Sequence, residues 1–157
     1  MRLHVLAVGD RMPEWIVSAC EEYEKRMPRE ARINLKEIRP EKRDSGKSVS
    51  RIQEAEAGRI MTALPKACHL VVLDERGELF STMDFAGLME GWMKEGKDVV
   101  FVIGGADGVW QDLKQKADKL FSLSRMTLPH GIARVMLIEQ LYRAVSIINH
   151  HPYHREG

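Results

Sequence analysis

Cysteine is scarce in this chain of 157 residues, which contains only Cys20 and Cys68. Two thiols can form at most one crosslink, so the disulfide-stapled scaffolds of small secreted proteins are excluded. An unpaired cysteine behaves as a small apolar side chain, and we expect both thiols to be free and buried. Low cysteine content is typical of a reducing compartment, which predicts a cytoplasmic protein.

Long apolar runs are also missing. The run at the N-terminus, residues 3–8, is too short for a signal peptide and is not followed by a small-residue cleavage site. The longest apolar segment, residues 132–148, contains three charged side chains, Arg134, Glu139 and Arg143. A membrane-spanning helix would not carry these charges, so we expect no membrane association.

The common phosphate-binding motifs are absent as well. Gly104, Gly105 and Gly108 do not have the G-x-G-x-x-G spacing of a dinucleotide-binding turn. Residues 46–48 end like a P-loop, but the position of its first glycine is occupied by Glu41. No spacing of Ser, His and Asp, or of Cys and His, indicates a hydrolytic nucleophile. Dinucleotide, NTPase and hydrolase sites are therefore not supported.

Histidine is concentrated near the C-terminus, at His150, His151 and His154, with His130 earlier. Pro152 interrupts any helix that would bring His150 and His154 to one face, and no cysteine or carboxylate cluster lies beside them. We therefore expect no metal site. The histidines instead favour a catalytic or nucleic-acid-binding role.

The formal net charge of +1 hides a strong asymmetry. Residues 25–51 hold ten Lys or Arg against four Asp or Glu, and residues 125–157 hold four Arg against two Glu. The rest of the chain is acidic. Two separate basic regions on an acidic body are typical of a polyanion-binding surface, although residues 25–51 taken alone also fit an ordinary solvated surface.

Apolar periodicity predicts alternating strands and helices in a single domain spanning residues 1–157. The predicted strands are 3–8, 33–38, 69–74, 99–103 and 120–123, and residues 75–78 are expected to form a turn. The predicted helices are 13–27, 49–64, 81–95, 109–119 and 130–148. In the second helix the expected apolar face is Ile52, Ala55, Ile60 and Met61. This alternation indicates an α/β fold with a parallel, helix-covered sheet.

Three of the predicted strands end in Leu73-Asp74, Ile103-Gly104-Gly105 and Leu123-Ser124. Ligands of parallel sheets bind beyond the carboxyl ends of strands, and paired glycines let a ligand approach the backbone, although they also occur in simple tight turns. His130 and Arg134 begin the last predicted helix and are candidates to contact a ligand or RNA. Glu139 and Arg143 have the spacing of a structural ion pair.

An ordered set of short motifs runs through the whole chain. It begins with Leu3-x-x-Leu6-Ala7-Val8-Gly9 and Met12-Pro13-x-Trp15, and continues with Ile103-Gly104-Gly105-x-x-Gly108 and Leu123-Ser124-x-Met126-Thr127-Leu128-Pro129-His130. It ends with Arg134-Val135, Glu139-x-Leu141-Tyr142-Arg143-Ala144 and Asn149-x-x-Pro152-Tyr153-His154. Each piece is weak alone, but together they resemble the RlmH (YbeA-like) family of SPOUT-class methyltransferases.

The resemblance implies an α/β fold whose C-terminal segment forms a trefoil knot, an exception to the rule against knots. It implies a homodimer that binds S-adenosyl-L-methionine in the knot and methylates N3 of pseudouridine 1915 in helix 69 of 23S rRNA within assembled ribosomes. The cofactor positions that it implies are Leu73, Gly104, Leu123, Ser124, Arg125, Met126, Thr127 and Leu128. The catalytic and substrate positions that it implies are His130, Arg143, Tyr153, His154 and Arg155.

The chemistry of these residues agrees with such a reaction. Methyl transfer from a sulfonium is an in-line displacement, so the protein must mainly align donor and acceptor and make the nucleophile available. Our hypothesis is that His154 takes the N3 proton or passes it to water, that Arg143 or Arg155 holds the anionic base or a phosphate, and that Tyr153 stacks on the base. Two alternatives remain: a non-catalytic ribosome-binding protein, and a knotted methyltransferase that acts on tRNA.

Overall fold

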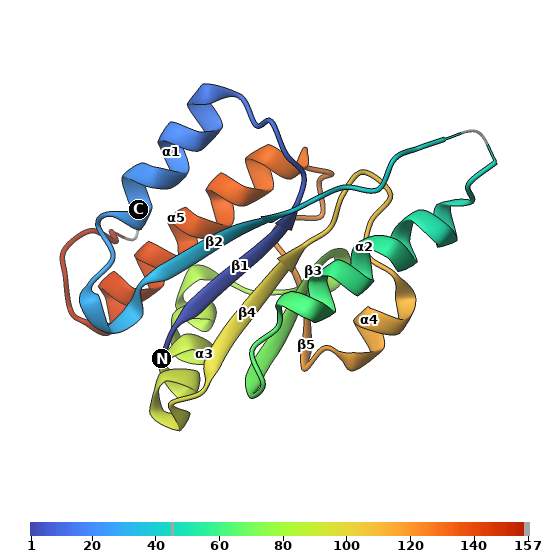
Figure 1. Ribbon diagram of the computed structural model, residues 1–157. Helices are drawn as coiled ribbons and strands as arrows, with labels where there is room; N and C mark the ends of the chain where they lie inside the picture. The colour runs from blue at the N-terminus through green and yellow to red at the C-terminus, as the bar shows by residue number, and fades with distance from the viewer. Residues whose placement is uncertain (45, 156–157) are drawn as a thin grey trace.

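The computed structural model describes residues 1–44 and 46–155 of the chain. Strands and helices alternate along it, as Figure 1 shows. The strands are β1 (Leu3–Val8), β2 (Ile33–Ile38), β3 (Cys68–Leu79), β4 (Asp98–Ile103) and β5 (Lys119–Ser122). The helices are α1 (Glu14–Glu24), the short 3₁₀ helix η1 (Arg29–Ala31), α2 (Val49–Ala63), α3 (Thr82–Glu95), α4 (Gln111–Lys116) and α5 (His130–Ile148).

The strands form one sheet in the order β2-β1-β4-β3-β5, and every pair in it is parallel. Leu3 of β1, for example, is in register with Ile33 on one side and with Val99 on the other. Because all strands run the same way, their carboxyl ends lie together. This confirms the predicted parallel sheet, and it places the segments that follow β1, β3, β4 and β5 side by side.

Helices cover both faces of the sheet (Figure 1). Leu3, Val5 and Ala7 of β1 belong to the core formed with α3 and α5, whereas Leu6 and Val8 belong to the core formed with α2 and α4. Helix α1 packs on α5 outside the first core. Burial of both faces explains why the central strands are continuous apolar runs rather than alternating ones.

Strand β3 is longer than the sequence predicts, and the turn expected at residues 75–78 is wrong. The strand continues to Leu79 through an irregularity in which Leu73 and Glu78 both pair with Phe121. Gly77 makes this close approach possible, because a Cβ at this position would lie 2.8 Å from the backbone carbonyl carbon of Leu120 and the backbone nitrogen of Phe121. The extra residues of β3 bulge toward the segment that follows β5.

Helix boundaries follow local signals closely. Ser81 accepts a hydrogen bond from the backbone N–H of Asp84 at 3.1 Å, and α3 ends at Gly96 in the left-handed conformation, with φ of 75°. Helix α4 is shorter than predicted, covering only 111–116. No helix among the described residues is long and apolar enough to cross a membrane.

Two burial predictions need correction. The buried face of α2 consists of Ile52, Glu56, Ala57 and Ile60, whereas Ala55 and Met61 are only partly covered. Of the two free cysteines, Cys20 is buried, as predicted, and Cys68 at the start of β3 is half-buried. Burial raises the pKa of the Cys20 thiol to about 11, which keeps it in the neutral, unreactive form at physiological pH.

Candidate active site

A cavity of about 560 Å³ opens beyond the carboxyl ends of β3, β4 and β5. Its walls are the glycine turn after β4, the loop after β5 and the first turn of α5. The predicted cofactor positions that line it are Leu73, Gly104, Leu123, Ser124, Met126, Thr127 and Leu128. Arg125 is exposed and is not part of the lining. The structure thus brings together residues that lie up to 55 positions apart in the sequence.

The glycine turn forms one wall because its backbone is folded tightly on itself. The backbone N–H of Gly108 donates to the carbonyl of Gly105 at 3.0 Å, and Gly108 has a φ of 80°. A Cβ on Gly104 would lie 2.7 Å from Cγ2 of Val109 and 3.0 Å from the carbonyl carbon of Gly108. Glycine at position 104 is therefore required by the space available.

The loop after β5 is held by hydroxyl groups. Ser122 donates to the carbonyl of Ser124 at 2.8 Å, and the backbone N–H of Met126 donates to the Ser124 hydroxyl at 2.9 Å. Thr127 donates to the Glu75 carboxylate at 3.2 Å, which ties the loop to the bulged part of β3. The irregularity in β3 therefore supports one wall of the cavity.

A charged pair lies on the opposite wall. Nζ of Lys114 in α4 is 2.6 Å from Oδ2 of Asp74 in β3, and both residues line the cavity. Burial raises the pKa of Asp74, but the hydrogen bonds from Lys114 and from the Arg76 backbone N–H outweigh it, so that the pKa lies below its ordinary value. Asp74 is thus held as a carboxylate beside a predominantly apolar cavity.

The two candidates at the start of α5 have different surroundings. His130 lines the cavity. Arg134 is only 2% exposed, and its guanidinium contacts the Glu37 carboxylate at 2.9 Å and the Gly9 carbonyl at 3.1 Å. These contacts connect α5 to the ends of β1 and β2. The guanidinium of Arg134 is therefore engaged inside the fold and does not face the cavity.

The three catalytic candidates lie together at the other end of α5. Glu139 accepts hydrogen bonds from Nε of Arg143 at 2.7 Å and from the Tyr153 hydroxyl at 3.3 Å. Nη1 of Arg143 lies 3.2 Å from Nδ1 of His154, and its guanidinium stacks over the Tyr153 ring at 4.7 Å. The ion pair of Glu139 and Arg143 has the geometry that the sequence predicts, and it also organises the tail.

This cluster is partly shielded from water. The hydrogen bond to Glu139 raises the pKa of Arg143, and burial raises the pKa of Tyr153. Nε2 of His154 is buried and has no hydrogen-bond partner among residues 1–44 and 46–155. Arg155 is exposed beside the cluster. Because a guanidinium only donates, Nδ1 of His154 accepts from Arg143, and the neutral ring carries its hydrogen on Nε2. A stacked, ion-paired group of this kind can position a base.

The cluster and the cavity are far apart within one chain. His130 and Arg143 are separated by 13 residues of a continuous helix, which corresponds to about 20 Å at 1.5 Å per residue. The structure therefore does not bring the predicted catalytic residues to the predicted cofactor residues of the same chain.

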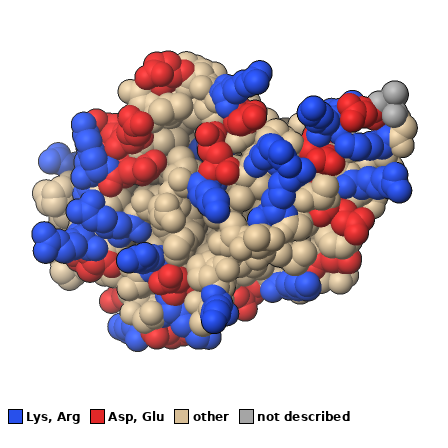
Figure 2. Space-filling view, viewed as in Figure 1, with Lys and Arg blue, Asp and Glu red and all other residues tan. Residues whose placement is uncertain are grey.

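Part of the basic segment 25–51 is engaged in ion pairs and part is free. Lys25 and Arg26 pair with Glu22, Lys47 pairs with Glu41, and Arg43 pairs with Asp107. Within the described part of the chain, the exposed cations of this segment without an acidic partner are Arg29, Arg32, Lys36, Arg39, Lys42 and Arg51. Figure 2 shows Lys and Arg side chains, interspersed with Asp and Glu, over the segment that follows β2.

Three residues at or near the cavity were missed from the sequence. Asp74 ends an apolar run, which is only a weak sequence signal for a site residue. No sequence pattern marks Lys114 as one. Glu56 had a clear one: it replaces an apolar residue in the i, i+4 series of Ile52 and Ile60. Burial raises the pKa of the Glu56 carboxyl. No group of three or more metal-ligating side chains occurs in the described residues.

Comparison with solved structures identifies the fold. A methylase-family protein of Haemophilus influenzae superimposes with a TM-score of 0.56 at 13% identity, over 94% of this chain and 66% of that chain. One from Neisseria gonorrhoeae has a TM-score of 0.56 at 12% identity, over 90% and 81%. At these identities the match shows the fold alone.

Sequence comparison identifies the family. A family model described as "Predicted SPOUT methyltransferase" matches residues 1–154, and the chain belongs to this family. Membership implies the C-terminal trefoil knot expected from the sequence. A protein of Methylobacillus flagellatus is 56% identical over 99% of this chain and 100% of its own length, and one of Burkholderia cenocepacia is 56% identical over 99% of both chains. Each is named ribosomal RNA large subunit methyltransferase H, which confirms the resemblance.

Proposed function

We propose that this protein is a single-domain enzyme that transfers a methyl group from S-adenosyl-L-methionine to N3 of pseudouridine 1915 in helix 69 of 23S rRNA. The acceptor is the assembled ribosome, which places the enzyme in the cytoplasm. The observation that carries the proposal is the 56% identity over the full chain to proteins named ribosomal RNA large subunit methyltransferase H. The cavity, the clustered tail and the free cations give that reaction a physical basis.

The residues around the cavity fit the proposed cofactor. A volume of about 560 Å³ is within the usual range for ligand pockets. Leu73, Leu123 and Leu128 offer apolar walls to a flat ring, while Asp74 and Lys114 offer an acceptor and a donor to hydroxyl and carboxylate groups. When bound, S-adenosyl-L-methionine supplies an electrophilic methyl group on a sulfonium.

The tail cluster would act on the acceptor base. His154 takes the N3 proton or passes it to water. Arg143 or Arg155 stabilises the negative charge that develops on the ring or holds a phosphate, and Tyr153 stacks on the extruded base. Glu139 orients Arg143 and Tyr153 together, so that both groups are in place before the base arrives.

A homodimer resolves the distance between cavity and tail. Because about 20 Å of α5 separates them within one chain, we propose that the tail of one subunit completes the cavity of the other. The surface beside α5 supports this arrangement, since Trp15 of α1 remains 59% exposed and offers a large apolar contact to a second copy.

Methyl transfer to purified substrates tests the proposed activity. The wild-type protein with labelled S-adenosyl-L-methionine should label ribosomes that lack the modification at pseudouridine 1915, with the label mapped to N3. His154→Ala should bind the cofactor normally by calorimetry and lose most single-turnover transfer. Labelling of free tRNA instead, or cofactor binding without any transfer, would support one of the two alternatives. Full transfer by His154→Ala would remove the proton-transfer role.

The free cations of segment 25–51 would contact rRNA phosphates. The double variant Arg39→Glu, Lys42→Glu should weaken ribosome binding. The slope of the logarithm of the binding constant against the logarithm of salt concentration should become shallower by about one unit for each phosphate that the variant no longer neutralises. Lys94→Glu, an exposed charge reversal on α3, is the matched control. Unchanged binding in the double variant would contradict this role.

A further inference from the structure

A second cavity, of about 270 Å³, adjoins the first. The two share the wall formed by residues 105–107 and His130. The second cavity extends from there past the end of β1, at Val8 to Asp10, toward the segment that follows β2. A ligand in it would therefore lie directly beside a ligand in the first cavity.

The second cavity lies at a point of the sheet where ligands commonly bind in parallel α/β folds. Strands β1 and β4 are neighbours in the sheet, but the chain leaves β1 toward β2 on one side and leaves β4 toward β5 on the other. The cavity lies outside the carboxyl ends of these two strands. Ligands of open parallel sheets bind at such points, where the connections of adjacent strands diverge.

Glu56 gives the second cavity a buried acceptor. Its side chain, on α2, is 5% exposed, and Oε2 accepts the backbone N–H of Glu41 at 3.0 Å. Oε1 has no hydrogen-bond partner among the described residues. A Cβ on Gly105 would lie 3.3 Å from Oε1, so the missing side chain leaves this oxygen facing the glycine turn and the cavity.

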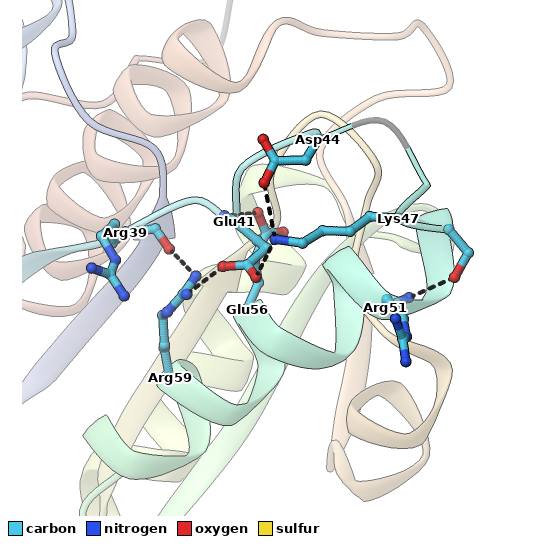
Figure 3. Close-up of polar contacts among 8 residues, drawn as sticks. Arg39, Glu41, Asp44, Lys47, Arg51, Glu56 and Arg59 are labelled. Atoms are coloured by element: carbon cyan, nitrogen blue, oxygen red, sulfur yellow. Dashed lines mark hydrogen bonds and ion pairs between the residues drawn. The ribbon is translucent and has the colours of Figure 1, made fainter.

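The carboxylate of Glu56 is held in this orientation by the segment that follows β2, through the backbone N–H of Glu41. Figure 3 shows Glu41 between Arg59 and Lys47, whose charged groups lie 2.5 Å and 3.1 Å from its carboxylate oxygens. This fixes the backbone N–H of Glu41, and with it Oε2 of Glu56. At the rim, Arg43 pairs with Asp107 at 2.9 Å and connects the same segment to the glycine turn.

We propose, on the basis of the proposed function, that the second cavity receives the acceptor base and that Oε1 of Glu56 accepts the N1–H of pseudouridine. In pseudouridine the ring is joined to ribose through carbon, so both ring nitrogens carry hydrogen. In uridine N1 is the glycosidic nitrogen and has no hydrogen. Oε1 of Glu56 therefore gains a hydrogen bond from the N1–H of pseudouridine, whereas uridine leaves it unpaired. A buried carboxylate oxygen without a partner opposes binding of uridine.

Glu56→Gln tests this assignment with little change in shape. The amide oxygen must take the N–H of Glu41, which turns the amide NH₂ toward the cavity and replaces an acceptor by a donor. We would compare kcat/KM on two ribosome preparations, one with pseudouridine and one with uridine at the target position. Wild type should prefer pseudouridine, and Glu56→Gln should lose that preference by about tenfold or more, mainly through slower transfer to pseudouridine.

Matched measurements separate this role from folding and from the proposed activity. Glu54→Gln, an exposed change on the same helix, should keep the wild-type preference. Glu56→Gln should bind S-adenosyl-L-methionine with wild-type affinity by calorimetry. If Glu56→Gln does not fold, Gly105→Ala, which places a methyl group 3.3 Å from Oε1, should reduce the preference instead.

Several outcomes would overturn the assignment. Retention of the wild-type preference by folded Glu56→Gln, or by Gly105→Ala in its place, would do so, as would a wild-type enzyme that does not distinguish the two substrates. A wild-type enzyme that binds the cofactor and methylates neither ribosome would overturn the proposed function together with this inference. The activity of wild type therefore distinguishes the two failures.

Discussion

Arg134 illustrates how one residue type can serve two purposes in this chain. Both Arg134 and Arg143 lie on the same apolar helix, but Arg134 is buried against Glu37 and the Gly9 carbonyl, whereas Arg143 joins a partly open stacked cluster. Gly9 has a φ of 141°, and Nη2 of Arg134 would lie 3.1 Å from a Cβ there. A guanidinium is the side chain that reaches both acceptors at once.

We expect Arg134→Met to lower the free energy of unfolding by about 2 kcal/mol, because it removes two hydrogen bonds at the ends of β1 and β2. Denaturant titration measures this change. Arg32→Met, an exposed substitution without an ion-pair partner in the described residues, should have little effect. Wild-type stability combined with weakened ribosome binding would show that Arg134 contacts RNA.

Asp98 links β4 to the start of β1. It accepts a hydrogen bond from the Arg2 backbone N–H at 2.9 Å, and its other oxygen lies 3.1 Å from Nε2 of His4. Burial raises the pKa of Asp98, but these hydrogen bonds lower it by more, and its pKa in the folded protein is below the ordinary value. Its stabilising contribution is therefore present above the ordinary carboxyl range and is lost as pH falls through the folded-state pKa.

Asp98→Asn should consequently reduce stability at pH 7 by about 1 kcal/mol, and the difference from wild type should shrink as the pH falls below about 4. Thermal melts across this range measure the effect. Glu90→Gln, an exposed change on α3, serves as the control. A difference in stability between wild type and Asp98→Asn that is constant with pH would show that the carboxylate charge is not responsible.

At the scale of elements, the pairing of β3 with β5 determines the shape of the first cavity, the proposed cofactor site. The bulged part of β3 supplies Glu75, whose carboxylate accepts a hydrogen bond from Thr127 in the loop after β5, and Gly77 lets the two backbones approach. We expect Gly77→Ala to destabilise the fold by about 2 kcal/mol and to weaken binding of S-adenosyl-L-methionine by about tenfold.

Calorimetry and denaturant titration on Gly77→Ala measure both effects. Gly87→Ala in α3, where a Cβ would meet nothing within 4 Å, is the matched control and should be neutral or stabilising. Normal cofactor affinity in Gly77→Ala would show that the loop after β5 holds its shape independently of β3.

The elements that the sequence predicts well depend on local signals. Apolar runs, periodicity and the Ser81 cap locate the strands and helices because these signals act within one or two turns of chain. The bulge of β3 depends instead on a distant partner in the sequence, Phe121. Residues 75–78 therefore look like a turn in isolation. The same limit applies to Glu56, whose polarity is visible in the sequence although its orientation toward Gly105 is not.

At the scale of the whole molecule, the proposed dimer can be tested by mixing two inactive chains. A His154→Ala chain keeps its cavity, and a Gly104→Val chain keeps its tail. If each site combines one cavity with the partner's tail, half the mixed dimers are hybrids with one working site each, which gives about a quarter of wild-type activity. If each site lies within one chain, the mixture stays inactive. Each variant alone, refolded in the same way, is the control.

The two outer strands of the sheet have a consequence for how copies of this chain associate. Strand β5 has only four residues, and β2 presents Asn34, Lys36 and Glu37 to solvent. Short, charged outer strands resist the edge-to-edge pairing from which aggregates grow. Any association of two copies is therefore directed to the helices that cover the sheet and not to its edges.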